Sequence, residues 1–193
     1  MSKPWSTKAI DCLLGLAVAT SLTGCTGSEA KPESEPTTPA STEPHSPAPP
    51  EETRPQAAVP TVPVAARRPG KAGVRAQVEF LVETLNYAML TGDAAPLRAM
   101  SKCVGCIAYA DLYEQTYEQG GMFRDSTWTV KDQLIYKVQG SYYSFADVRA
   151  AAGTYRERKG ASLQKIGMQQ YRIRVVVKGA DGEWTITGLK DAS

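Results

Sequence analysis

The chain has 193 residues and is nearly balanced in charge, with 22 lysine and arginine residues against 20 acidic ones and a net charge of +2. A nucleic-acid-binding protein needs a clustered basic face, which this balance does not provide, so we expect no nucleic-acid partner. His45 is the only histidine. With a single histidine in the chain, we do not expect a hydrolase that uses an imidazole as the general base beside a serine or cysteine nucleophile.

Residues 1–24 have the pattern of a secretory signal peptide. Lys3 and Lys8 precede a mostly apolar run over residues 12–22. A membrane-spanning helix needs about 20 apolar residues, so this run is too short to be one. The following Leu22-Thr23-Gly24-Cys25 resembles the bacterial lipoprotein signal motif. This resemblance implies that Cys25 receives lipid and that the exported protein is anchored to the outer face of the cell membrane.

Residues 25–73 have the composition of a tether. After Cys25 they contain eleven prolines and no aromatic residue, and serine, threonine, glutamate and alanine fill most of the remaining positions. Such a sequence cannot bury enough apolar surface to offset the entropy of ordering the chain, so we predict a disordered linker. His45 lies within it and is therefore no candidate for a catalytic role.

Helical spacing begins after the tether. Apolar residues three and four positions apart predict a helix over residues 74–89, and Gly92 is expected to cap its end in the left-handed conformation. Asp93 is expected to cap a short second helix. A third helix is predicted over residues 103–119, ending at Gly120.

From Trp128 onward the apolar spacing changes to two, the period of β-strands. Alternation predicts strands near residues 128–130, 134–138 and 148–152. The clearest strand is expected over residues 169–178, joined by a turn at residues 179–182 to a strand over residues 183–190. These last two strands predict a hairpin.

Helices followed by antiparallel strands predict an α+β domain over residues 74–193, with three N-terminal helices packed on a curved antiparallel sheet. This order resembles the nuclear transport factor 2-like, or cystatin-like cone, fold. Four further elements occur in order along this domain: Leu85-Asn86-Tyr87-Ala88, Thr91-Gly92-Asp93, Cys103-Val104-Gly105-Cys106 and Trp184. With them the chain resembles, more narrowly, a family of actinobacterial lipoproteins catalogued as a domain of unknown function. This resemblance implies a fold and a location, but no reaction.

Cys103 and Cys106 remain once Cys12 leaves with the signal peptide and Cys25 carries lipid. In an oxidising compartment we expect them to form a disulfide that clamps the corner before the third helix. Redox exchange through the same pair is the alternative, because a thiol at a helix N-terminus has a lowered pKa. No metal site is expected, since two cysteines supply only half of a tetrahedral zinc site.

A cone with an open end would contain a cavity, and five residues are candidates for its lining: Tyr87, Tyr113, Trp128, Leu134 and Tyr136. The same aromatic side chains could instead fill the cone as core. Catalysis of the isomerase or dehydratase type would need Asp111 or Asp147 beside one of the tyrosines. No catalytic residue is assigned, and no cofactor is expected.

A set of basic residues near one hairpin could bind an anionic wall polymer or a partner protein: Arg156, Arg158, Lys159, Lys165, Arg172 and Arg174. We therefore expect a non-catalytic binding domain held at the membrane by lipid. The alternatives are an enzyme that uses the cone cavity and a redox protein that uses Cys103 and Cys106. The sequence does not determine the oligomeric state.

Overall fold

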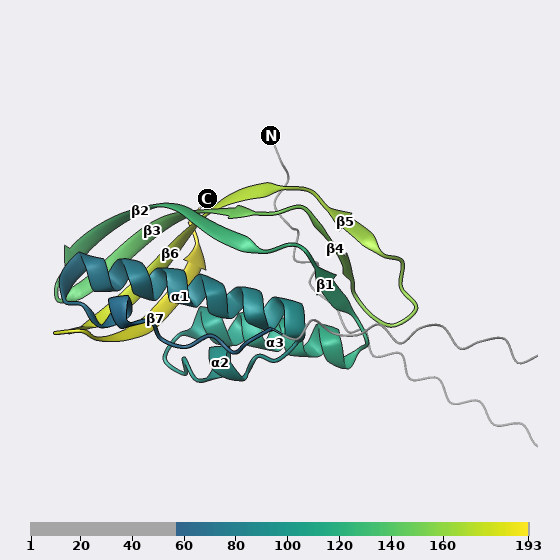
Figure 1. Ribbon diagram of the computed structural model, residues 1–193, viewed down its shortest axis with the longest axis horizontal. Coiled ribbons are helices and arrows are strands. Elements are labelled where there is room, and N and C mark those ends of the chain that lie inside the picture. The colour runs from purple at the N-terminus through teal and green to yellow at the C-terminus, as the bar shows by residue number, and fades with distance from the viewer. Residues whose placement is uncertain (1–56, 193) are drawn as a thin grey trace, which may run out of the picture. The chain divides into compact units, whose positions relative to one another are not determined.

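The computed structural model describes residues 57–192 (Figure 1). The predicted signal peptide, Cys25 and most of the predicted tether lie outside the described residues. Four helical segments precede the strands: the 3-10 helix η1 (Val64–Arg67) and the α-helices α1 (Gly70–Thr91), α2 (Ala95–Arg98) and α3 (Val104–Glu118). Of the three predicted helices, two are long and α2 is a single turn. No helix in the described part of the chain is long and apolar enough to span a bilayer.

The first described elements lie before residue 74, within the segment predicted as tether. Helix α1 begins at Gly70, and η1, which ends three residues earlier, packs against it. Gly73 lies so close to Arg68 that a β-carbon at this position would meet the Arg68 carbonyl oxygen and the Trp184 indole. The Trp184 indole nitrogen donates a hydrogen bond to that carbonyl oxygen at 2.9 Å. Gly73 therefore allows close packing, although the glycine and proline content of this segment resembles that of a linker.

Seven strands form two antiparallel sheets, so the α+β class and the antiparallel arrangement are confirmed, although we had expected one curved sheet. The four-stranded sheet has the order β2-β3-β6-β7 and the three-stranded sheet has the order β1-β4-β5. Their bounds are β1 (Met122–Arg124), β2 (Trp128–Val138), β3 (Ser141–Ala150), β4 (Gly153–Arg156), β5 (Gln164–Ile166), β6 (Gln169–Ala180) and β7 (Glu183–Asp191). In Figure 1 the small sheet prolongs β2, β3 and β6 beyond a bend.

Two tight turns set the register of the four-stranded sheet. Gln139 and Gly140 join β2 to β3 with φ angles of 47° and 77°, and Asp181 and Gly182 join β6 to β7 with φ angles of 53° and 89°. Positive φ at both central residues is the feature of type I′ turns, whose twist matches that of the strands they join. The predicted hairpin at residues 169–190 is confirmed. The hairpin of β2 and β3 was predicted only in part.

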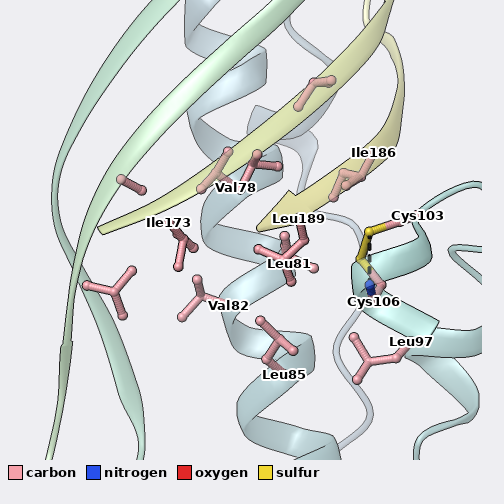
Figure 2. Close-up of a cluster of buried hydrophobic side chains, with 14 of the residues drawn as sticks. Val78, Leu81, Val82, Leu85, Leu97, Cys103, Cys106, Ile173, Ile186 and Leu189 are labelled. Atoms are coloured by element: carbon pink, nitrogen blue, oxygen red, sulfur yellow. Dashed lines mark hydrogen bonds between the residues drawn. A yellow bond between two sulfur atoms is a disulfide. The ribbon is translucent and has the colours of Figure 1, made fainter. Parts of the chain in front are cut away.

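The core lies between α1 and the inner face of the four-stranded sheet. Val78, Leu81 and Leu85 of α1 are almost completely buried, and Figure 2 shows them facing side chains of β6 and β7 such as Ile173 and Leu189. The residues of α1 that face inward recur three and four positions apart, because that spacing returns to the same side of a helix every turn. Burying one such aliphatic side chain contributes about 2 kcal/mol.

A β-bulge in β2 determines which side chains of this strand face outward. The register to β3 shifts between Val130 and Asp132, which adds one residue to β2 and reverses the alternation beyond it. Beyond the bulge, Gln133 and Ile135 are buried, whereas the intervening Leu134 is exposed. The buried Gln133 amide donates to the Arg75 carbonyl oxygen at 3.3 Å and accepts from the Ser144 hydroxyl at 3.3 Å.

Candidate functional site

The outward-facing side of the four-stranded sheet carries contiguous apolar side chains, and we refer to it as the outer sheet face. The relative exposures are 55% for Leu134, 47% for Tyr136 and 51% for Val138. The pairing Leu134–Phe145 and Tyr136–Tyr143 brings partly buried aromatic rings of β3 onto the same face. In β6, Val176 pairs with Tyr143 and adds a third row. The outer sheet face is thus formed by Leu134, Tyr136, Val138, Tyr143, Phe145 and Val176.

Contacts between aromatic rings stabilise the side chains of the outer sheet face. The rings of Tyr136 and Phe145 meet edge to face, with their centroids 6.4 Å apart, and such pairs stabilise a sheet beyond the area they bury. The helices pack on the opposite face (Figure 1). A solvated sheet face normally carries polar side chains. A contiguous apolar surface on it is the usual mark of a binding site.

Basic side chains lie on the same face beside the apolar rows. Arg174 pairs with Phe145 across the strands, and Arg172 forms a two-point ion pair with Asp147, with distances of 2.7 and 3.0 Å. The hydrogen bond from Arg172 holds the pKa of Asp147 below its ordinary value. Lys190 of β7 is exposed and pairs with Arg174, and Lys178 is exposed four residues farther along β6. The cations therefore exceed the carboxylates beside this apolar surface.

The structure divides the five predicted cavity residues into two groups. Tyr87 and Tyr113 are buried, and Trp128 is partly buried against the core. The prediction is wrong for Leu134 and Tyr136, which lie on the outer sheet face, because the bulge after Val130 reverses the alternation. The sequence contained a signal for the missed Tyr143 and Phe145, since they alternate with buried residues directly after the Gln139-Gly140 turn.

A row of aromatic rings packs between α3 and the strands. Neighbouring ring centroids lie 5.6 to 5.9 Å apart along the row, which consists of Tyr171, Trp128, Tyr109, Tyr113, Phe123 and Tyr155. Burial raises the pKa of Tyr113 and of Tyr109. The inward aromatics thus pack on one another as core, which was the alternative to a ligand cavity.

The Asn-Tyr-Ala and Thr-Gly-Asp elements form a hydrogen-bonded corner at the end of α1. Asn86 donates to the Trp128 carbonyl oxygen at 2.8 Å and accepts from the Trp128 N–H at 2.7 Å. Tyr87 donates to Asp93 at 2.7 Å, and this bond raises the pKa of Tyr87. Gly92 has a φ of 75° and packs against the ring of Tyr117, which leaves no space for a β-carbon. These residues have structural roles.

Cys103 and Cys106 form the predicted disulfide, with a Cα–Cα distance of 5.2 Å. Both residues are fully buried in the core beside Leu97, and the Cys103 sulfur accepts a hydrogen bond from the Cys106 N–H at the start of α3 (Figure 2). A pair with no exposed surface is not available for exchange in the folded domain, which argues against the redox alternative. The position of the disulfide at the start of α3 favours the predicted role as a clamp of the corner before this helix.

The carboxylates proposed for catalysis do not meet the tyrosines. Asp111 is exposed on α3 and forms an ion pair with Arg98 at 2.7 Å, and Asp147 lies on the outer sheet face in its pair with Arg172. The hydrogen bond from Arg172 lowers the pKa of Asp147, which makes this carboxylate a weak base. Within residues 57–192 no group of three or more histidine, cysteine or acidic residues is arranged to hold a metal ion.

The predicted basic cluster is divided between two surfaces. Arg172 and Arg174 belong to the outer sheet face. Arg156 and Lys165 lie on β4 and β5, and Arg158 and Lys159 are exposed in the loop between these strands. The two surfaces lie on different sheets, so the six residues do not form one site.

These observations define an α+β domain with an exposed apolar sheet face. Residues 45–190 match the family of unknown function DUF6318, and the chain belongs to this family. The predicted membership in a domain of unknown function is thereby confirmed. The description of the family mentions neither lipoproteins nor a bacterial group, so these parts of the resemblance stay predictions.

Two solved structures show distant similarity. The intermembrane space region of the chloroplast protein ARC6 is 12% identical, with 60% of this chain and 93% of that chain covered and a TM-score of 0.39. A variant of Rd1NTF2_05 is 14% identical, with 62% of this chain and 99% of that chain covered and a TM-score of 0.33. Similarity at this level establishes no shared fold, so the cone-like topology stays a prediction. No curated protein matches the sequence.

Proposed function

We propose that this chain is an exported lipoprotein whose domain binds a partner protein through the outer sheet face and catalyses no reaction. The observation that carries the proposal is the exposure of Leu134, Tyr136 and Val138, each about half exposed, beside the rings of Tyr143 and Phe145. Exposed aromatic residues are enriched at protein interfaces because they bury large areas at a low cost in conformational entropy.

The charges beside the surface favour an acidic partner. Arg174, Lys178 and Lys190 lie beside the apolar rows, whereas Asp147 is already paired with Arg172. A partner with carboxylates around an apolar centre would complement this arrangement, and the opposite charges would speed association. A second copy of this chain carries the same excess of cations on this face, which disfavours self-association through it.

Photocrosslinking tests the proposed surface. A photoreactive phenylalanine analogue is placed at Tyr136 in the natively anchored protein, and at Leu112, which is 43% exposed on α3, as the control. We expect a crosslinked protein at Tyr136 and not at Leu112. The purified partner should then bind the Tyr136→Thr/Phe145→Thr variant at least tenfold more weakly than the parent, and Arg174→Glu should also weaken binding. Equal crosslinking at both sites, crosslinks only to a second copy, or unchanged affinity in the variants would overturn the proposal.

The lipid anchor rests on the sequence of residues 1–25. Lipid chains contribute about 0.8 kcal/mol per buried methylene, so two or more chains make attachment effectively permanent. Replacing Cys25 with Ala should release the protein from membranes or leave it with its signal peptide uncleaved. Fractionation and mass spectrometry of the N-terminus measure this. Unchanged membrane attachment without acyl mass would contradict the anchor and leave the binding proposal untouched.

A further inference from the structure

The hairpin formed by β4 and β5 exposes two large apolar side chains at the ends of its second strand. Leu163 directly precedes β5 and Met168 follows it by two residues, and each is 55% exposed. The Met168 sulfur accepts a hydrogen bond from the exposed Arg149 at 2.9 Å. Neither residue belongs to the outer sheet face or to the core, so neither is explained by the binding surface proposed above.

Cations lie on the same hairpin as these apolar side chains. Arg158, Lys159 and Lys165 are exposed on the same hairpin, where Glu157 is the one acidic residue over 153–166. The loop is held in place, because the Lys159 N–H donates to the Gln119 carbonyl oxygen at the end of α3 at 2.8 Å. Basic side chains and Leu163 are thus presented together on an anchored loop, and Met168 lies at the other end of β5.

We propose that this hairpin docks the domain onto an anionic lipid bilayer, with the cations against the headgroups and Leu163 and Met168 entering the interface. Lysine and arginine are attracted by the negative surface potential of anionic lipids. Exposed apolar side chains among such cations gain by moving into the boundary between headgroups and acyl chains. A soluble polyanion would satisfy the cations alone and would leave Leu163 and Met168 exposed.

The position of the hairpin is compatible with an anchored chain. The chain enters the domain at Arg67 and Arg68, beside the β6–β7 turn, whereas the hairpin lies at the opposite end of β6. The 12 residues of β6 span about 40 Å at about 3.3 Å per residue. The residues between Cys25 and Pro63 can cover more than this distance at about 3.3 Å each. The inference rests on the proposed export and anchoring only in placing the domain beside a membrane.

Vesicle cosedimentation tests the hairpin without the lipid anchor. The probe is the chain over residues 25–193 with Cys25→Ser, mixed with phosphatidylcholine vesicles that do or do not contain about one third phosphatidylglycerol. We expect binding to the anionic vesicles only. The Arg158→Gln/Lys159→Gln and Leu163→Ser/Met168→Ser variants should each bind about tenfold more weakly, the first because two cations are lost and the second because apolar contact is lost.

Matched controls remove the same charge or apolar surface elsewhere. Arg174→Gln/Lys178→Gln makes the same change of net charge on the outer sheet face, and Leu112→Ser removes an exposed leucine from α3. Both should bind the anionic vesicles as the parent does. No binding to anionic vesicles, an equal loss in the charge control, or full binding by Leu163→Ser/Met168→Ser would overturn the proposal. Full binding of anionic vesicles by Leu163→Ser/Met168→Ser, together with binding of soluble polyphosphate, would identify the hairpin as a polyanion site instead. Because the acyl anchor and the partner are absent, failure here leaves the proposed function standing.

Discussion

Asn86 connects helix α1 to the four-stranded sheet through both polar atoms of its side chain. Its amide nitrogen and oxygen satisfy the carbonyl oxygen and the N–H of Trp128, at the first residue of β2. These backbone groups are partly buried, and β2 pairs with β3 from this point on. A side chain that both donates and accepts is needed here, which explains an asparagine in a helix.

Replacing Asn86 with Ala should lower the free energy of unfolding by about 2–3 kcal/mol, because two partly buried backbone groups lose their partners. Urea unfolding measures the loss. Glu83→Ala, an exposed position one turn earlier on α1, should change stability by less than about 0.5 kcal/mol. A loss at Asn86 no greater than that at Glu83 would contradict the role assigned to the amide.

The ionisation of Tyr113 is expected to make the free energy of unfolding fall at alkaline pH. Burial raises its pKa above the ordinary value of 10.0, so the folded chain holds this proton where the unfolded chain releases it. The contribution to stability is therefore complete below about pH 10 and is lost as the pH rises through the folded pKa.

The Tyr113→Phe variant should keep close to the stability of the parent at pH 8, because the ring of Tyr113 makes the contacts to Tyr109 and Phe123. Above pH 10 the parent should lose stability more steeply than the variant, by up to roughly 1 kcal/mol per pH unit. Urea midpoints between pH 8 and pH 11.5 measure the difference. Parallel curves for the two proteins would show that the tyrosine ionises equally in both states.

At the level of elements, helix α3 packs directly on the backbone of β7. A β-carbon added to Gly105 would meet the carbonyl oxygen of Leu189, so the helix approaches as closely as a glycine allows. The buried disulfide of Cys103 and Cys106 fixes the same turn of chain. Glycine and disulfide thus act together at the start of α3.

Gly105→Ala should lower the free energy of unfolding by about 2 kcal/mol, since overpacking against a backbone atom outweighs the gain of up to about 1 kcal/mol in helix propensity. Gly167→Ala serves as the control, because a β-carbon there meets open space. Thermal or urea unfolding of both variants measures the effect. A stabilised Gly105→Ala protein would show that α3 can move away from β7 at little cost.

The elements with regular periodicity could be predicted from the sequence, and the others could not. Gly92 marked the end of α1, and the alternation over 169–190 marked the β6–β7 hairpin. Strands β1, β4 and β5 have three or four residues each, too few to show a period, and they form through pairing with distant segments. For the site, the outward direction of Leu134 and Tyr136 depended on a bulge that leaves no mark in the composition of β2.

At the level of the whole molecule, the outer sheet face and the β4–β5 hairpin lie on different sheets. Arg174 and Lys178 are five or more residues along β6 from its junction with β5, a separation of about 17 Å or more. Substitutions this far apart generally act independently. The geometry thus permits the two proposed surfaces to be occupied at the same time.

Combining Tyr136→Thr/Phe145→Thr with Leu163→Ser/Met168→Ser should give additive effects on the two binding free energies, within about 0.5 kcal/mol. The sheet-face pair should reduce partner binding alone, and the hairpin pair should reduce vesicle binding alone. Cosedimentation and partner titration of the parent, both pairs and the combined protein provide the measurement. A hairpin pair that also weakened partner binding would indicate one continuous surface.

The extra residue in β2 has a consequence for how this family can vary. Lys131 is the residue that has no register partner in β3, and Val130 and Asp132 on either side of it pair with the consecutive residues Val148 and Asp147. Deleting Lys131 would therefore restore unbroken alternation and leave Leu134 and Tyr136 facing outward. The bulge is thus the point where this strand can change in length without exchanging the interior for the contact surface, and relatives that differ in length here are expected to keep the same outward positions beyond it.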